Sequence, residues 1–281
     1  MQGTYPNNGL ISTKLDELRS RNEGALVTYL TGGDPSPDRF LTNVAALIEG
    51  GADIVEVGVP FSDPIADGPV IQAASQRALN RGITPRRVLS LVRELSGQHD
   101  LPFVILTYYN PILAMGVERF LRTAKKSGVN GIVVPDLPAQ EDRVFQKQSA
   151  KQGIDRILLA APNTDQHRLR QILAETSGFL YLVSLYGVTG PRRVLGDSAS
   201  KSLDRIKSLN GHKTPVLAGF GVSKPNQIKE LLRAGADGAI VGSALVQITQ
   251  DQTHDENAME RRLRRRVAEL KAATRPRSTE A

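Results

Sequence analysis

Residues 51–59 read GADIVEVGV: a glycine, a polar turn residue and then a short, mostly apolar run. The same order recurs in GVNGIV at 128–133 and in GADGAI at 235–240. Amphipathic stretches precede these segments, for example at 40–48 and 228–232. A glycine that ends a helix at positive φ, followed by a β run, is typical of a helix-to-strand junction. Its repetition predicts a chain of tandem βα units.

Eight runs along the chain have the composition of strands, with helical patterns between successive runs. They are almost continuously apolar, as parallel strands covered on both faces are. The runs are 26–30, 54–59, 103–108, 131–134, 156–160, 179–185, 215–218 and 238–241. Eight βα units predict a single (β/α)8 TIM barrel. A doubly wound open sheet is the alternative, but the strand-to-helix turns lack its G-x-G-x-x-G fingerprint.

One extra helix is expected before the first strand and another after the last. Thr13-x-x-Asp16, with Leu15 and Leu18, resembles a capped N-terminal helix. Near the other end, apolar residues at helical spacing predict an amphipathic helix that docks on the barrel and turns its arginines to solvent. These apolar residues are Met259, Leu263, Val267 and Leu270.

The composition fits one globular domain. The 281 residues include 25 glycines and 40% hydrophobic residues, enough for a packed core. No linker rich in Pro, Gly and Ser divides the chain, so we expect one domain over 1–281. We expect an ordered barrel at 11–272 and flexible ends at 1–10 and 274–281.

Nothing in the sequence suggests a membrane or secretory segment. The first ten residues lack the basic and apolar regions of a signal peptide. The apolar stretch 102–115 is broken by Asn110-Pro111 and is shorter than the roughly 18 residues of a transmembrane helix. We therefore expect a cytoplasmic protein that does not bind membranes.

The charged and metal-binding residue types narrow the chemistry. The chain has no cysteine, which excludes disulfides, thiolate metal sites and a cysteine nucleophile, and its four histidines form no i, i+4 pair for zinc. The net charge is +7, but residues 260–281 hold eight Lys or Arg against three Glu and so account for +5. Without interleaved aromatic residues, this segment predicts a solvated basic face rather than a nucleic-acid site.

Glu56 is the first candidate for chemistry. Alternation along its strand places Val55, Val57 and Val59 on the helix-facing side, and Glu56 and Gly58 on the side that points into the barrel. An unpaired carboxylate there is costly, and burial raises the pKa of such a group. Glu56 is therefore a candidate general acid/base, with a structural carboxylate bonded to a neighbouring strand as the alternative.

Asp67 lies in the loop directly after this strand, in the stretch PFSDPIADGP at 60–69. Reacting groups of a barrel belong at the C-terminal ends of strands and in the loops that follow. Two carboxyl groups in different environments can divide the roles of proton carrier and charge stabiliser. Alone, Asp67 is equally consistent with a turn or helix-cap residue.

Two glycine motifs follow the last two strands. They are GFGVS at 219–223 and GS at 242–243, in the loops where barrels often bind phosphate through backbone N–H groups and a helix N-terminus. The alternative is that these glycines only allow the backbone to turn and bind no ligand. After the sixth strand, a polar stretch beginning LYGVTGPRR at 185–193 is either a lid or an ordinary surface loop.

Two absences restrict the reaction. The strand runs contain no lysine for a Schiff base or pyridoxal phosphate, and no strand ends in a histidine for a metal-dependent aldolase. The residues thus predict carboxylate acid/base chemistry on a phosphorylated small molecule.

EVGVPFSDPIADGP at 56–69 resembles the signature of the tryptophan synthase alpha chain family. The resemblance runs from about 24 to 270 and includes GDP at 33–35, PDLP at 135–138 and GVTG at 187–190, besides the two glycine motifs. It implies retro-aldol cleavage of indole-3-glycerol phosphate to indole and glyceraldehyde 3-phosphate, without a cofactor. It also implies that Glu56 is the general acid/base and that Asp67 accepts a hydrogen bond from the indole N–H.

The same resemblance implies further site residues and a partner. Tyr181 lies beside Glu56, and Thr189 is the lid residue that closes toward Asp67. Those that line the indole pocket are Tyr29, Leu106, Phe220 and Ile71, and those that hold the phosphate are Gly190, Gly221, Gly242 and Ser243. A pyridoxal phosphate beta chain receives the indole to make L-tryptophan, in a heterotetramer of two alpha and two beta chains. The residues near that interface are Pro60, Asp63, Asn110 and Asp136.

Three alternatives stay open. The chain could be a free-standing indole-3-glycerol phosphate lyase, a phosphate-binding barrel isomerase, or chiefly a regulatory subunit that activates its partner. The leader before Ile11 and the arginine-rich end lie outside the shared pattern, so the resemblance implies no role for them.

Overall fold

The computed structural model describes residues 9–139, 141, 143–183, 197–211, 213–219, 221–250 and 256–275. Within these ranges, nine strands form one sheet in the order β5-β4-β3-β2-β1-β9-β8-β7-β6, and every pairing is parallel. The two outer strands of this order are neighbours in the chain, so the sheet curls into a nearly closed barrel. The predicted TIM barrel is confirmed.

The strands match the predicted runs closely. They are β1 Ala25–Thr31, β2 Ile54–Gly58, β3 Phe103–Leu106, β4 Val129–Val133, β5 Asp155–Ile157, β6 Leu159–Ala160, β7 Leu180–Val183, β8 Val216–Gly219 and β9 Gly238–Val241. The single strand expected at 156–160 is divided at Leu158. β5 pairs with β4 and β6 with β7, because this strand changes neighbours where the barrel closes.

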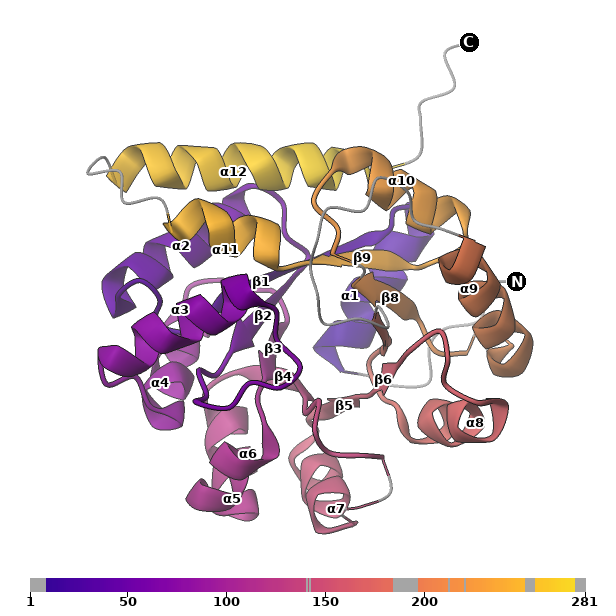
Figure 1. Ribbon diagram of the computed structural model, residues 1–281, viewed down its shortest axis with the longest axis horizontal. Helices are drawn as coiled ribbons and strands as arrows, with labels where there is room; N and C mark the ends of the chain where they lie inside the picture. Colours follow the sequence, from indigo (N-terminus) through magenta and orange to yellow (C-terminus); the bar gives the residue numbers. More distant parts are fainter. Residues whose placement is uncertain are drawn as a thin grey trace.

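The described residues form twelve helices, of which all but the first, which precedes β1, form the outer layer around the barrel (Figure 1). They are α1 Leu10–Ser20, α2 Pro37–Glu49, α3 Pro69–Asn80, α4 Pro85–Ser96, α5 Tyr109–Met115, α6 Val117–Lys126, α7 Arg143–Gln152, α8 Gln166–Glu175, α9 Asp197–Asn210, α10 Pro225–Arg233, α11 Ser243–Gln250 and α12 Glu256–Ala272. Among these helices, none is long and apolar enough to cross a membrane.

The interior of the barrel is filled partly by α1. Ile11, Leu15 and Leu18 of this helix belong to one buried cluster with inward residues of the strands, such as Val27 and Ile54. The extra N-terminal helix is thus confirmed, and it closes the lower part of the barrel with apolar side chains. The predicted cap is wrong: the N-cap is Gly9, and Thr13 lies inside the helix, where its hydroxyl donates to the Gly9 carbonyl.

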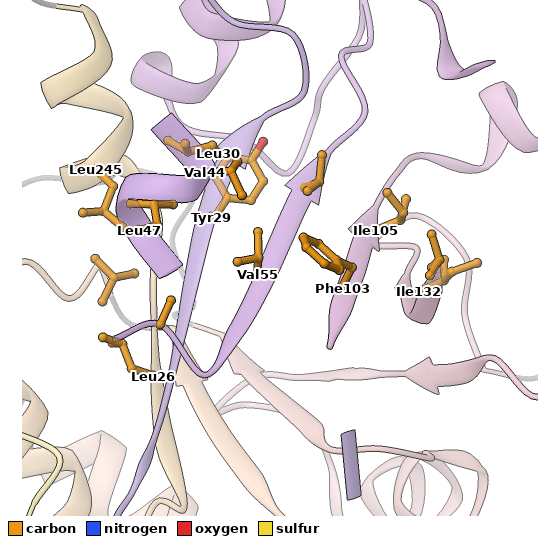
Figure 2. Close-up of a cluster of buried hydrophobic side chains, with 14 of the residues drawn as sticks. Leu26, Tyr29, Leu30, Val44, Leu47, Val55, Phe103, Ile105, Ile132 and Leu245 are labelled. Atoms are coloured by element: carbon orange, nitrogen blue, oxygen red, sulfur yellow. The ribbon is translucent and has the colours of Figure 1, made fainter. Parts of the chain in front are cut away.

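Between strands and helices lies the larger core. Leu26 and Leu30 of β1 pack in one cluster with Val44 and Leu47 of α2 and with Leu245 of α11 (Figure 2). The helix-facing valines of β2, Val55 and Val57, and Val59 directly after the strand are buried in the same cluster, as their alternation predicts. This orientation fixes Glu56, the residue between two of them, on the inner side of β2.

The apolar stripe of α12 docks on the barrel as predicted, with Met259, Leu263, Val267 and Leu270 all buried. Lys271 departs from the expected solvated basic face, because its ammonium is buried beside Asp53 at 2.8 Å and Glu23 at 3.2 Å. A buried cation needs such partners.

Thr274 also departs from the expected flexible tail. It is 1% exposed, and its carbonyl accepts a hydrogen bond from the Gly24 N–H at 2.9 Å. The end of α12 is therefore attached to the bottom of the barrel, one residue before β1 begins.

Lys271→Met should lower the free energy of unfolding by about 3 kcal/mol, because it leaves two mostly buried carboxylates, with side chains 10% and 17% exposed, without their shared cation. Arg264→Met is the matched control on the same helix: Arg264 pairs with Glu49, but both side chains are half exposed, so the loss should stay below about 1 kcal/mol. Urea unfolding of both variants measures the difference. Equal losses would contradict the assignment of Lys271 as the anchor.

Candidate active site

The inner positions at the C-terminal ends of β1, β2 and β3 bring the candidate residues together. Tyr29 of β1 is in register with Glu56 of β2. Gly58, the next inward position of β2, is in register with Leu106 of β3. Because parallel strands place their carboxyl ends at one edge, these side chains share the upper part of the barrel interior. The site residues on these three strands therefore lie side by side.

Glu56 is buried, with 1% of its surface exposed. Neither carboxyl oxygen has a hydrogen-bond partner within the described part of the chain. Burial, and secondly the charge of Asp67, raise the pKa of Glu56 to about 8. Glu56 is therefore largely protonated at pH 7, and no bond to a neighbouring strand supports the structural alternative.

Asp67 reaches the same site from the loop after β2. Burial raises its pKa to about 6, while a hydrogen bond from the Tyr108 hydroxyl acts in the opposite direction. Asp67 is not the cap of the next helix, because the N-cap of α3 is Gly68. At pH 7 the two carboxyl groups thus differ in charge: Asp67 is mostly ionised and Glu56 mostly neutral.

Two tyrosine rings occupy space that strand glycines leave free. The Tyr29 hydroxyl, 3.3 Å from the Thr31 hydroxyl, lies where a side chain on Gly58 would begin. In the same way, a Cβ on Gly219 would lie 2.7 Å from the Tyr181 ring. Burial and the charge of Glu56 both raise the pKa of Tyr181, so the phenol stays neutral beside the acid.

The glycine motifs lie on neighbouring strands. β8 and β9 are paired, which places the loops that contain Gly221 and Gly242 next to each other. Gly221 has a φ of +66°, a conformation that favours glycine. Ser243 begins α11, whose first N–H groups have no acceptor within the helix. Thr189, Gly190 and Phe220 lie outside the described residues.

The remaining predicted residues take two positions. Leu106 and Ile71, expected in the indole pocket, are partly buried: Ile71 packs on the larger core, and Leu106 packs on both that core and the barrel interior. The four expected at the partner interface lie in or beside the loops after β2, β3 and β4, and three of them are exposed: Asp63, Asn110 and Asp136, while Pro60 is buried. Asp136 also accepts a hydrogen bond at 2.9 Å from the Tyr109 N–H.

Sequence reasoning missed two contacts that hold the loops of this end. The Tyr108 hydroxyl accepts the Ala66 N–H at 2.9 Å, across 42 residues of sequence. Asp34 is 3% exposed and bound by two hydrogen bonds from the Arg77 guanidinium at 2.7 and 2.8 Å, which ties the loop after β1 to α3. The position of Tyr108 just after a predicted strand could have indicated the contact with Ala66. No sequence pattern indicated the pairing of Asp34 with Arg77.

The fold and the carboxyl pair define a class of protein: a (β/α)8 barrel enzyme that works by acid/base chemistry at the C-terminal end of its strands. The model of the tryptophan synthase alpha chain family matches residues 15–275, and the chain belongs to this family. It is thus a carbon–carbon lyase that cleaves indole-3-glycerol phosphate, as expected from the sequence motifs.

Individual relatives agree with the family. The tryptophan synthase alpha chain of Methanosarcina mazei is 44% identical over 89% of this chain and 90% of its own, and that of Carboxydothermus hydrogenoformans is 46% identical over 87% and 90%. Among solved structures, Mycobacterium tuberculosis tryptophan synthase has a TM-score of 0.87 at 36% identity, covering 95% of this chain and 98% of that one. A mutant alpha-subunit from Pyrococcus furiosus has a TM-score of 0.80 at 42% identity, covering 88% and 98%.

The raised pKa of Glu56 has a consequence for stability. Its pKa is 4.5 in a solvated chain and about 8 in the fold, so the folded state holds this proton more tightly. Between these two values, stability falls as pH rises, by up to about 1.4 kcal/mol per pH unit. The Glu56→Gln variant cannot ionise at this position. Between pH 4.5 and 8, its free energy of unfolding minus that of the wild type should therefore increase with pH, as urea unfolding at successive pH values would measure. A difference that stays constant with pH would contradict the raised pKa.

Proposed function

We propose that Glu56 carries the proton and that Asp67 stabilises the charge in the cleavage of indole-3-glycerol phosphate. The observation that supports this division is the pair of raised pKa values, about 8 for Glu56 and about 6 for Asp67. At neutral pH the first residue has a proton to give and the second has a negative charge. Both are what the cleavage of this carbon–carbon bond requires.

The steps follow from the chemistry of indole. Glu56 donates its proton to C3 of the ring, which leaves a positive charge shared with the ring nitrogen. Asp67 accepts a hydrogen bond from that N–H and stabilises the cation. The bond between C3 and the glycerol carbon then breaks and its electron pair returns to the ring. The glycerol hydroxyl gives its proton to the Glu56 carboxylate, so the products are indole and an aldehyde, and Glu56 is restored.

The other site residues position the substrate in this proposal. Tyr29, Leu106, Ile71 and Phe220 line the indole pocket, and Tyr181 keeps a neutral phenol beside Glu56. Backbone N–H groups around Gly190, Gly221, Gly242 and Ser243 hold the phosphate, supported by the adjacency of β8 and β9. Thr189 closes the lid over Asp67. No cofactor takes part, because the protonated ring itself accepts the electron pair.

Membership in the family implies a tryptophan synthase beta chain as partner. We propose that the two form a heterotetramer of two alpha and two beta chains, and that indole passes to the beta chain for L-tryptophan synthesis. The region proposed for contact contains exposed Asp63, Asn110 and Asp136, with Pro60 buried beside them, from three adjacent strand-to-helix loops. The chain is proposed to act as one domain in the cytoplasm, where its charged phosphate-ester substrate is retained.

Glu56→Gln should lower kcat for indole release by about 10²- to 10⁴-fold, because it removes the proton carrier and keeps the shape of the side chain. Asp67→Asn should lower kcat by a similar range, since it removes the charge that faces the cation. Circular dichroism checks that both variants are folded. A folded Glu56→Gln variant with normal indole release would overturn the proposed mechanism.

The same assay, run with and without an added tryptophan synthase beta chain, separates the open alternatives. A rate that rises with the partner is expected for a member of a complex. A high rate that the partner leaves unchanged would favour a free-standing lyase, and cleavage that is absent without the partner would favour a chiefly regulatory subunit.

A further inference from the structure

We propose that Tyr108 is a positioning residue: it holds the loop after β2 so that Asp67 faces Glu56 with its charge intact. This inference rests on the role proposed above for Asp67. It concerns a residue that the sequence motifs do not single out, and it is supported by contacts of the Tyr108 ring and hydroxyl.

Tyr108 lies between β3 and α5, two residues after the end of the strand that pairs with that of Glu56. It is 1% exposed, and its ring stacks on Phe61 with centroids 5.3 Å apart and an interplanar angle of 30°. Its hydroxyl accepts the Ala66 N–H at 2.9 Å. One buried side chain thus contacts the loop near its beginning and near its end.

The hydroxyl has a second use. A phenol can accept one hydrogen bond and donate another. The Tyr108 hydroxyl is within reach to donate to the carboxylate of Asp67, the residue directly after Ala66, and lowers its pKa. This bond favours the ionised form of Asp67 against burial, which raises the pKa of Asp67. Burial also raises the pKa of Tyr108, so its proton stays available for donation.

Within the loop itself, the backbone hydrogen bonds of the described residues are local. The Ile65 N–H donates to the Asp63 carbonyl and the Asp67 N–H to the Pro64 carbonyl, bonds that shape turns but do not orient the loop against the barrel. Tyr108 supplies that orientation because it belongs to a different strand-to-helix unit. Tyr108 contacts Phe61 and Ala66 of the loop after β2. We therefore expect it to act on the reaction by positioning Asp67, which the same loop carries.

Tyr108→Phe removes the hydroxyl and keeps the stacked ring. We expect kcat/KM for indole-3-glycerol phosphate to fall at least about tenfold at pH 7, because the loop loses the hydrogen bond to Ala66 that orients Asp67. The acid limb of the kcat/KM profile should move up by about one pH unit, because Asp67 then holds its proton to higher pH. Tyr109→Phe is the control: it removes the hydroxyl of the neighbouring tyrosine, whose ring packs edge-on against Phe145 of α7, and the profile should not change.

A double-mutant cycle keeps the inference testable if Tyr108→Phe is also less stable. Added to Asp67→Asn, the Tyr108→Phe change should cause little further loss, since the residue through which it acts is already disabled. An unshifted acid limb, or full additivity with Asp67→Asn, would overturn the inference and leave a structural role only. An active Asp67→Asn single variant would instead overturn the role proposed for Asp67 itself.

Discussion

Every second side chain of a barrel strand must point into an interior that excludes water, and this alternation governs the whole site. In the lower part of the barrel the inward positions are apolar, and Ile11, Leu15 and Leu18 of α1 fill the remaining space. In the upper part the same alternation turns Glu56 inward, beside Tyr29. A carboxyl group in that place has no water to solvate its charge, so it holds a proton at neutral pH.

The difference between the two carboxyl groups follows from where the fold places them. Glu56 is on a strand, deep in the interior, and has no hydrogen-bond partner among the described residues. Asp67 is on a loop near the Tyr108 hydroxyl. That hydroxyl lowers the pKa of Asp67 and offsets part of the rise caused by burial. One scaffold thereby maintains an acid and an anion within reach of one substrate, without a metal cluster in the part of the chain that the structure describes.

Local patterns in the sequence were sufficient for the barrel, for both extra helices and for the inward direction of Glu56, because periodicity and turn residues determine these features. Contacts between distant segments were not accessible in this way. The bond from Ala66 to Tyr108 spans 42 residues, and Lys271 was expected in solvent although it pairs with Asp53, 218 residues away. The division of the fifth strand at Leu158 likewise depends on barrel closure, which no local run encodes.

In the folded chain, desolvation keeps Glu56 protonated at neutral pH. The most direct test is a carbon-13 NMR titration of the glutamate side-chain carboxyl groups, with Glu56→Gln identifying the signal of Glu56. A titration midpoint near pH 8 is expected. A midpoint near the ordinary value of 4.5 would contradict the account, because Glu56 would then have no proton to donate at pH 7.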